Sequence, residues 1–179
     1  MASRLFEKIF APGPAKAAGA RLYESAVTQA RRPALYTALH APDTVEGRFE
    51  VYSLHVSLLL LRLKGQGPAA AAVSQVLFDQ FVSGLDHGLR ELGVGDLTVG
   101  KKMRKLGEAF YGRVRSYDEA LAALPDRVAL DAVLRRTALA EDAAADSGPL
   151  GDYAAACRDA LAAQATEALS DGQVSWPTP

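Results

Sequence analysis

The sequence predicts an all-α fold: a single compact helical domain of six or seven helices with a central antiparallel helical hairpin. Three observations support this prediction. No stretch alternates apolar and polar residues over the length of a β-strand. Alanine-rich runs such as 69–72 favour helix, and glycines and prolines divide the chain into pieces of helical length. The 179 residues, 49% of them hydrophobic and 23% charged, have the composition of one globular domain.

The N-terminal part is predicted to contain two helices. Residues 1–10 form an amphipathic turn or two and lack the apolar run of a signal peptide. A Pro-Gly-Pro break precedes a second helix over about 15–31, which Pro33 ends.

The central hairpin is predicted from its caps and its turn. Asp43, with Glu46 three residues later, forms a capping box for a helix that runs to about residue 64. The glycines and proline of residues 65–68 close this helix and start the next, which runs to about residue 92.

The rest of the chain is predicted to form three more helices. Asp96 is expected to be the N-cap of a long helix that continues to residues 117–124. Two Ala/Leu-rich helices follow over about 127–142 and 150–169, and the tail from residue 170 is expected to fray.

Three glycines are expected to be structural. Gly93 and Gly95 would shape a turn that needs positive φ, and Gly112 would allow another helix to approach closely.

No catalytic or metal site is predicted. Cys157 is the single cysteine, and His40, His55 and His87 have no Cys or His at the helical spacings that metal or haem ligands use. No serine lies in a nucleophile elbow. The longest apolar stretch, 56–63, is far shorter than the roughly 20 residues that cross a bilayer. We expect a soluble protein without a cofactor, and any membrane contact is expected to be peripheral.

A cationic cluster marks the start of the long helix after residue 96. It consists of Lys101, Lys102, Arg104 and Lys105, which gather on one side of a helix. Two interpretations remain open: a solvated helix surface, or a docking patch for anionic lipid headgroups, nucleic-acid phosphate or an acidic partner. Further along the same helix, Phe110, Tyr111 and Arg113 are candidates for partner binding, with core packing as the alternative.

A line of polar residues recurs along the first hairpin helix. Arg48, His55 and Arg62 are seven residues apart and therefore share one stripe. An antiparallel register centred near residue 67 would pair Arg48 with Asp86 and His55 with Asp79, and would bring Arg62 close to Gln75. This arrangement is either a buried polar network that fixes the hairpin register or a groove that reads a client or ligand.

Several short motifs occur in order between residues 20 and 124. They are QARRP at 29–33, PDTVEGRF at 42–49, LRELGVGD at 89–96, KKMRKL at 101–106 and AFYGR at 109–113. Together they resemble the ubiquinol-cytochrome c chaperone family, and the resemblance implies a domain of that type over residues 20–124. Outside it lie an N-terminal amphipathic helix and linker over 1–19 and Ala-rich C-terminal helices and a tail over 125–179.

The resemblance implies binding and not catalysis. Members of this family resemble assembly factors that help newly made cytochrome b enter ubiquinol-cytochrome c reductase, and the mitochondrial ones act near the ribosome with a small partner protein. The absence of a long targeting extension favours the bacterial branch. This implies a cytoplasmic protein at the inner face of the bacterial inner membrane, or in the mitochondrial matrix if it is organellar.

The expected partners are therefore nascent or unassembled cytochrome b and, in addition, the ribosome or an anionic membrane surface, with no specific DNA. The alternative function is a haem- or small-ligand-handling protein that uses a polar groove at Arg48, His55 and Asp79.

Overall fold

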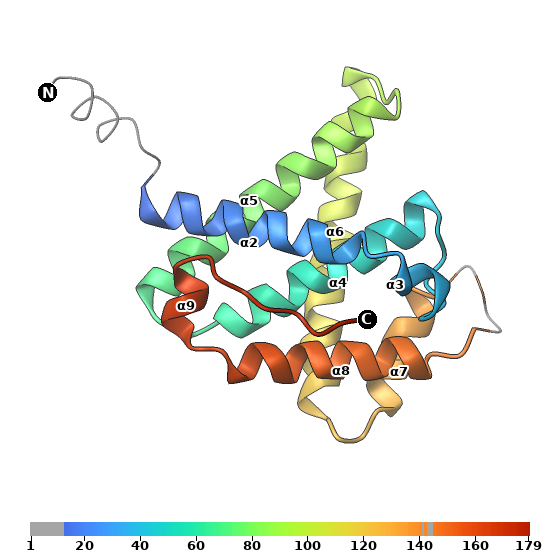
Figure 1. Cartoon of the computed structure of the whole chain (residues 1–179). Coiled ribbons are helices and arrows are strands. Elements are labelled where there is room, and N and C mark those ends of the chain that lie inside the picture. The colour runs from blue at the N-terminus through green and yellow to red at the C-terminus, as the bar shows by residue number, and fades with distance from the viewer. Residues whose placement is uncertain (1–12, 141, 143–144) are drawn as a thin grey trace, which may run out of the picture.

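Helix α4 (Val45–Leu63) lies at the centre of the fold, surrounded by other helices. The computed structural model describes residues 13–140, 142 and 145–179, so the helix predicted within 1–10 lies outside the described residues. The all-α class is confirmed, and the described residues contain no strand. The remaining helices are α2 (Pro14–Ala30), α3 (Ala34–Thr37), α5 (Pro68–Glu91), α6 (Asp96–Ala122), α7 (Val128–Arg136), α8 (Gly148–Ala163) and α9 (Thr166–Ser170) (Figure 1).

The central helix is buried on almost every side because α2, α5, α6 and α8 all pack against it. Every residue from Ser53 to Leu59 is buried, including the polar His55 and Ser57. The Ser57 hydroxyl donates to the carbonyl oxygen of Ser53 at 2.6 Å. The His55 ring nitrogens and the Ser57 hydroxyl thus have partners, whereas the buried Ser53 hydroxyl has none among the described residues.

The predicted hairpin is formed by α4 and α5. The turn between them contains Gly65 and Gly67, which have φ values of +74° and +97° and so adopt a conformation that favours glycine. Helix α2 packs against both arms of the hairpin. Figure 1 shows that the far end of α5 and the start of α6 extend together beyond the other helices.

Two helix starts lie one residue away from their predicted positions. Thr44, and not Asp43, is the N-cap of α4, and its hydroxyl accepts the Gly47 amide at 3.0 Å. The Asp43 carboxylate instead accepts from Arg48 at 2.6 Å. Asp96 is the first residue of α6, after the N-cap Gly95. In both places a nearby arginine binds the carboxylate that was expected to cap the helix.

The glycine predictions are partly correct. Gly93 has a φ of +81°, as expected, but Gly95 has an ordinary φ of −70°. A Cβ at Gly112 would meet nothing within 4 Å, so the predicted close helix approach there is wrong. The close approach occurs between α2 and α5, where a Cβ at Gly19 would lie 2.6 Å from the side chain of Val76.

Replacing Gly19 with alanine should therefore lower the free energy of unfolding by about 1–3 kcal/mol through overpacking of the α2–α5 contact. Gly112→Ala is the matched control, because it removes a glycine from the interior of a helix at an open position. It should stabilise the protein by about 0.5–1 kcal/mol. Urea unfolding of both variants measures the difference. Equal stabilities would show that α2 and α5 tolerate the added methyl group.

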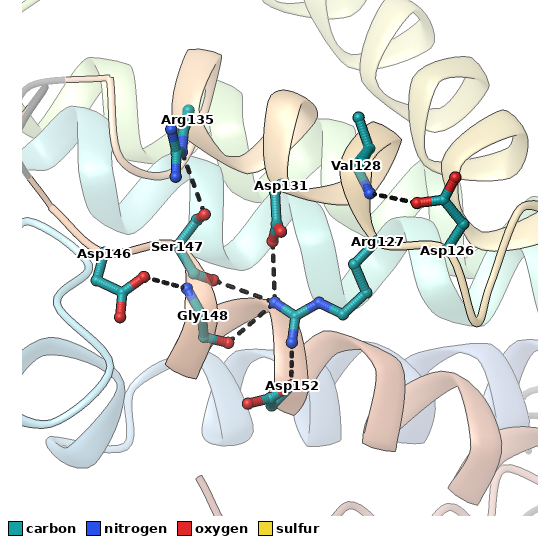
Figure 2. A network of polar contacts seen from close by, with 9 residues as sticks. All are labelled: Asp126, Arg127, Val128, Asp131, Arg135, Asp146, Ser147, Gly148 and Asp152. Carbon is teal, nitrogen blue, oxygen red and sulfur yellow. Dashed lines mark hydrogen bonds and ion pairs between the residues drawn. The ribbon is translucent and has the colours of Figure 1, made fainter.

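The C-terminal helices share the core of the rest of the chain, which runs from Ala18 to Leu169. An arginine network ties α7 to α8 (Figure 2). Arg127 donates to Asp131 at 2.9 Å and to the Gly148 carbonyl at 3.0 Å, and it also pairs with Asp152. Because these groups come from both helices, the network fixes α7 against the start of α8.

The boundaries of the last elements differ from the prediction. Helix α7 ends at Arg136, and the helix predicted over 150–169 is divided into α8 and α9 by an extended Gln164. The expectation of a frayed tail is wrong. The Trp176 indole donates to Ser25 at 3.0 Å, and the Pro177 carbonyl accepts from Gln29 at 2.9 Å. These bonds hold the tail against α2.

Candidate functional site

His55 lies in a closed polar cluster between α4, α8 and the C-terminal tail. Its Nδ1 lies 2.8 Å from the Val51 carbonyl oxygen and its Nε2 lies 2.8 Å from the Tyr153 hydroxyl. The Tyr153 hydroxyl also accepts from Gln29 at 2.8 Å, and the Trp176 ring packs edge-on against the imidazole. Burial lowers the pKa of His55 to about 4, so the ring is neutral at pH 7.

The predicted polar network across the hairpin is not formed. Asp79 is exposed and accepts from Gln75, its neighbour one turn away on α5, at 2.8 Å. Asp86 pairs with Arg90 at 2.6 Å, also within α5. The predicted pairs Arg48–Asp86 and His55–Asp79 are therefore wrong, although Gln75 and Asp79 do meet each other.

The other two members of the predicted line have separate roles. Arg48 is exposed, where it pairs with Asp43 and lies 5.1 Å above the Tyr36 ring. Arg62 donates to the carbonyl oxygens of Leu161 and Gln164 at 2.8 and 2.7 Å, at the C-terminal end of α8. The physical reason is that α8 and the tail, and not α5, cover this side of α4.

These positions remove the basis for the alternative of a ligand groove at Arg48, His55 and Asp79. His55 is enclosed and both ring nitrogens have protein partners, whereas Asp79 is exposed on another helix.

An apolar groove of about 610 Å³ lies between α2, α4, α5 and α6. We call it the α2–α6 groove. Its apolar lining includes Val27, Val45, Phe49, Leu85, Leu89 and Leu106. Arg31, Arg48 and Arg113 also line it, together with Glu46 and Glu50, so an apolar surface is combined with charged groups of both signs. The groove reaches Leu92, the C-cap residue of α5.

The sequence did not reveal this groove, because its apolar residues have the same helical spacing as core residues and come from four separate helices. One available signal was Val45 at the first turn of α4, which is exposed next to the helix cap. Of the candidate site residues, Arg48 and Arg113 line the groove.

Arg113 forms a forked ion pair with both carboxylate oxygens of Glu50 at the groove wall. The side chains of Arg113 and Glu50 are 20% and 10% exposed. The guanidinium also lies 5.4 Å from the centre of the Phe49 ring. The pair joins α4 to α6 and holds a positive group beside the apolar lining.

The aromatic candidates next to Arg113 have different environments. Phe110 is buried, and its ring centre lies 4.4 Å from that of Phe81. Tyr111 is exposed and packs on Phe78 with ring centres 5.6 Å apart. Phe110 is a core residue, and Tyr111 lies on the surface outside the α2–α6 groove.

The cationic cluster is exposed on α6, as its sequence pattern predicts. Arg104 pairs with Glu108 at 3.0 Å. Lys101, Lys102 and Lys105 form no salt bridge with any residue that the structure describes. Lys102 lies one helical turn before the groove residue Leu106 and on the same face, so the cations continue the groove toward the end of the α5–α6 hairpin.

Reactive or metal-binding groups are not gathered in the described part of the chain. Within it, no cluster of three or more His, Cys, Asp or Glu side chains is arranged to hold a metal ion. Burial raises the pKa of the Cys157 thiol to about 12, so it stays protonated at neutral pH. The described helices include none that is long and apolar enough to cross a membrane.

Comparison with known proteins gives concordant results. The model of the ubiquinol-cytochrome c chaperone family matches residues 37–176 and thus extends past the motifs that end near residue 124. The crystal structure of the Cbp3 homolog from Brucella abortus is similar over 99% of this chain and 97% of its own, with a TM-score of 0.85 and 40% sequence identity.

Two curated relatives are similar over a shorter region. Ubiquinol-cytochrome-c reductase complex assembly factor 1 of Xenopus laevis is 27% identical over 120 residues, which are 67% of this chain and 60% of the relative. The Homo sapiens protein with the corresponding name is 28% identical over 122 residues, which are 68% of this chain and 40% of the relative. The aligned region thus spans three fifths or less of the length of these relatives.

Proposed function

This chain belongs to the ubiquinol-cytochrome c chaperone family, and from that premise we propose that it is a non-catalytic assembly chaperone for ubiquinol-cytochrome c reductase. The relatives carry assembly-factor names, which support a role in assembly. We further propose that the client is newly made or unassembled cytochrome b, bound at the inner face of the bacterial inner membrane.

The α2–α6 groove is the observation that carries the client proposal. A membrane-protein segment that has not yet reached its final partners exposes apolar side chains, which gain free energy when they leave water. The groove offers Val45, Phe49 and Leu89 on an open surface of the protein. An apolar helix can lay one face into such a groove, as in other helix-in-groove complexes.

The arginines beside the apolar lining restrict the kind of segment that fits. Arg31 and Arg48 line the groove next to apolar side chains. Acidic residues or carbonyl groups at the end of an apolar client helix would meet these cations, which adds orientation to a contact that is otherwise non-directional. Arg48 and Arg113 contribute less than Arg31, because Asp43 and Glu50 are already paired with them.

The test is capture of cytochrome b by groove variants. Val45→Asp and Leu89→Asp each place a carboxylate in the apolar lining, and each should weaken capture at least about tenfold, because a buried unpaired charge is costly. Val128→Asp is the matched control, since Val128 is 76% exposed and lies on α7, away from the groove. Co-purification of tagged chaperone with cytochrome b, and the absorbance of assembled cytochrome b in cells, measure the effect.

Two results would contradict the proposal at different levels. If both groove variants capture cytochrome b as the unmodified protein does, the client uses another surface. If deletion of the gene leaves assembled cytochrome b unchanged, the assembly role itself is wrong.

A further inference from the structure

The end of the α5–α6 hairpin exposes large apolar side chains to solvent. We call residues 92–97 the hairpin tip. Leu97 is 100% exposed and Leu92 is 62% exposed, which places both among the most exposed large apolar residues of the described chain. Figure 1 shows the tip extending beyond the other helices. Such exposure costs free energy in water, so a protruding apolar tip indicates a contact surface.

Positive charge lies directly behind the tip. Lys101 follows Leu97 by four residues, which puts it on the same face of α6 and about 6 Å further along the helix axis. Lys102 and Lys105 continue this positive surface, and all three lysines are exposed.

The acidic side chains near the tip contact other groups and form no salt bridge with these lysines. Arg90 binds both Asp86 and Asp96, His87 contacts Glu91 at 3.2 Å, and Arg104 binds Glu108. The lysines are therefore the cations that remain available to an outside partner.

We propose that the hairpin tip docks on an anionic lipid surface, with Leu92 and Leu97 entering the boundary between headgroups and acyl chains and Lys101, Lys102 and Lys105 contacting the headgroup phosphates. The distance between Leu97 and Lys101 along α6 fits this arrangement. Apolar residues of interfacial helices are buried by about 5–10 Å, and Lys101 lies about 6 Å behind Leu97. Basic residues are attracted to such surfaces.

Lipid fits the tip better than nucleic acid does. Residues 92–105 contain no aromatic side chain on which a base could stack, whereas nonspecific binding of single-stranded nucleic acid combines cations with aromatic platforms. Phosphate contacts alone would not explain the two exposed leucines at the apex. Acyl chains would cover them.

Docking in this way would bring the α2–α6 groove to the membrane. Leu92 belongs to the tip and also lines the groove. An apolar segment that leaves the bilayer at this point would meet the groove without crossing open water. The proposed membrane contact does not depend on which client the protein binds, because lipid alone is the partner in this contact.

Co-sedimentation of the full chain with lipid vesicles tests this inference. Vesicles of phosphatidylglycerol and phosphatidylcholine should bind the protein, with binding weakened by salt, and vesicles of phosphatidylcholine alone should not. Neutralising Lys101, Lys102 and Lys105 to glutamine should weaken binding by about 100-fold, at about fivefold for each charge. The double variant Leu92→Ser and Leu97→Ser should weaken it by at least about tenfold.

The chain offers matched controls for both changes. Neutralising Lys16, Arg32 and Arg115 to glutamine removes the same positive charge from exposed positions away from the tip. Val128→Ser changes an exposed apolar residue after the opposite end of α6, which is about 40 Å long. Both controls should bind vesicles as the unmodified protein does. Because all the substituted side chains are exposed, every variant should keep its melting temperature.

A labelled cysteine reports insertion directly. In a Cys157→Ala background, Leu97→Cys carrying an environment-sensitive dye should shift its emission to the blue on anionic vesicles, and Val128→Cys should not. Vesicle binding that survives both tip variants would overturn the inference. Loss of binding in the lysine variant alone, with no dye shift, would also overturn it and indicate a purely electrostatic contact. Binding to ribosomes and not to vesicles would assign the lysines to RNA phosphate instead.

Discussion

Replacing Arg113 with methionine should destabilise the fold by about 3–5 kcal/mol, because the Glu50 carboxyl group would be left in a largely buried position without its partner. The Glu50 side chain is only 10% exposed, and Arg113 binds both of its oxygens. Methionine keeps much of the length of the arginine stem, so the loss of stability reports mainly the removal of the guanidinium charge. Urea unfolding measures the change.

The neighbourhood of Arg113 supplies the controls. Arg115, two residues later on α6, forms an exposed ion pair with Glu119, and Arg115→Met should change the unfolding free energy little. The double variant Glu50→Leu and Arg113→Met removes both charges and should recover most of the lost stability. If Arg113→Met proves no more harmful than Arg115→Met, the pair is not buried in solution.

Stability should fall by about 3 kcal/mol between pH 6.5 and pH 4 because of His55 alone. Burial lowers the pKa of His55 from 6.5 to about 4 in the folded protein. As the pH falls through 6.5, the His55 imidazole binds a proton in the unfolded chain but not in the folded protein, so the unfolded state is favoured. The contribution of His55 to the free energy of unfolding is complete above pH 6.5 and is lost by about pH 4.

Comparison with His55→Gln isolates this effect from the carboxylates that titrate in the same range. The variant lacks the titrating ring, so its unfolding free energy should decline less than that of the unmodified protein by about 3 kcal/mol over this interval. Denaturant unfolding at a series of pH values gives both curves. Parallel curves would mean that the imidazole is accessible to protons in the folded state.

Helix positions were largely predictable because their signals are local. The Gly65–Gly67 turn and Gly93 require positive φ, and the prolines after breaks start helices, whatever the rest of the chain does. The misplaced caps at Asp43 and Asp96 show the limit of such reasoning. A carboxylate can cap a helix or bind an arginine, and the choice depended on where Arg48 and Arg90 lay.

The candidate site was predictable only in part. The exposure of Lys101, Lys102 and Lys105 follows from their density of charge, since several cations cannot be buried together without partners. The line of Arg48, His55 and Arg62 was misassigned. A spacing of seven shows that residues share a stripe of one helix, but it does not show which neighbour covers that stripe.

By itself the sequence determined the all-α class, the order of the main helices, the family and the exposed cations of α6. Only the tertiary structure decided that α8 and the tail enclose His55, that Arg113 meets Glu50, and that four helices form the α2–α6 groove. The physical reason is sequence separation. His55 and Tyr153 are 98 positions apart, and Glu50 and Arg113 are 63 apart. Periodicity within one helix carries no information about partners at such distances, because they meet only when separate apolar faces pack together.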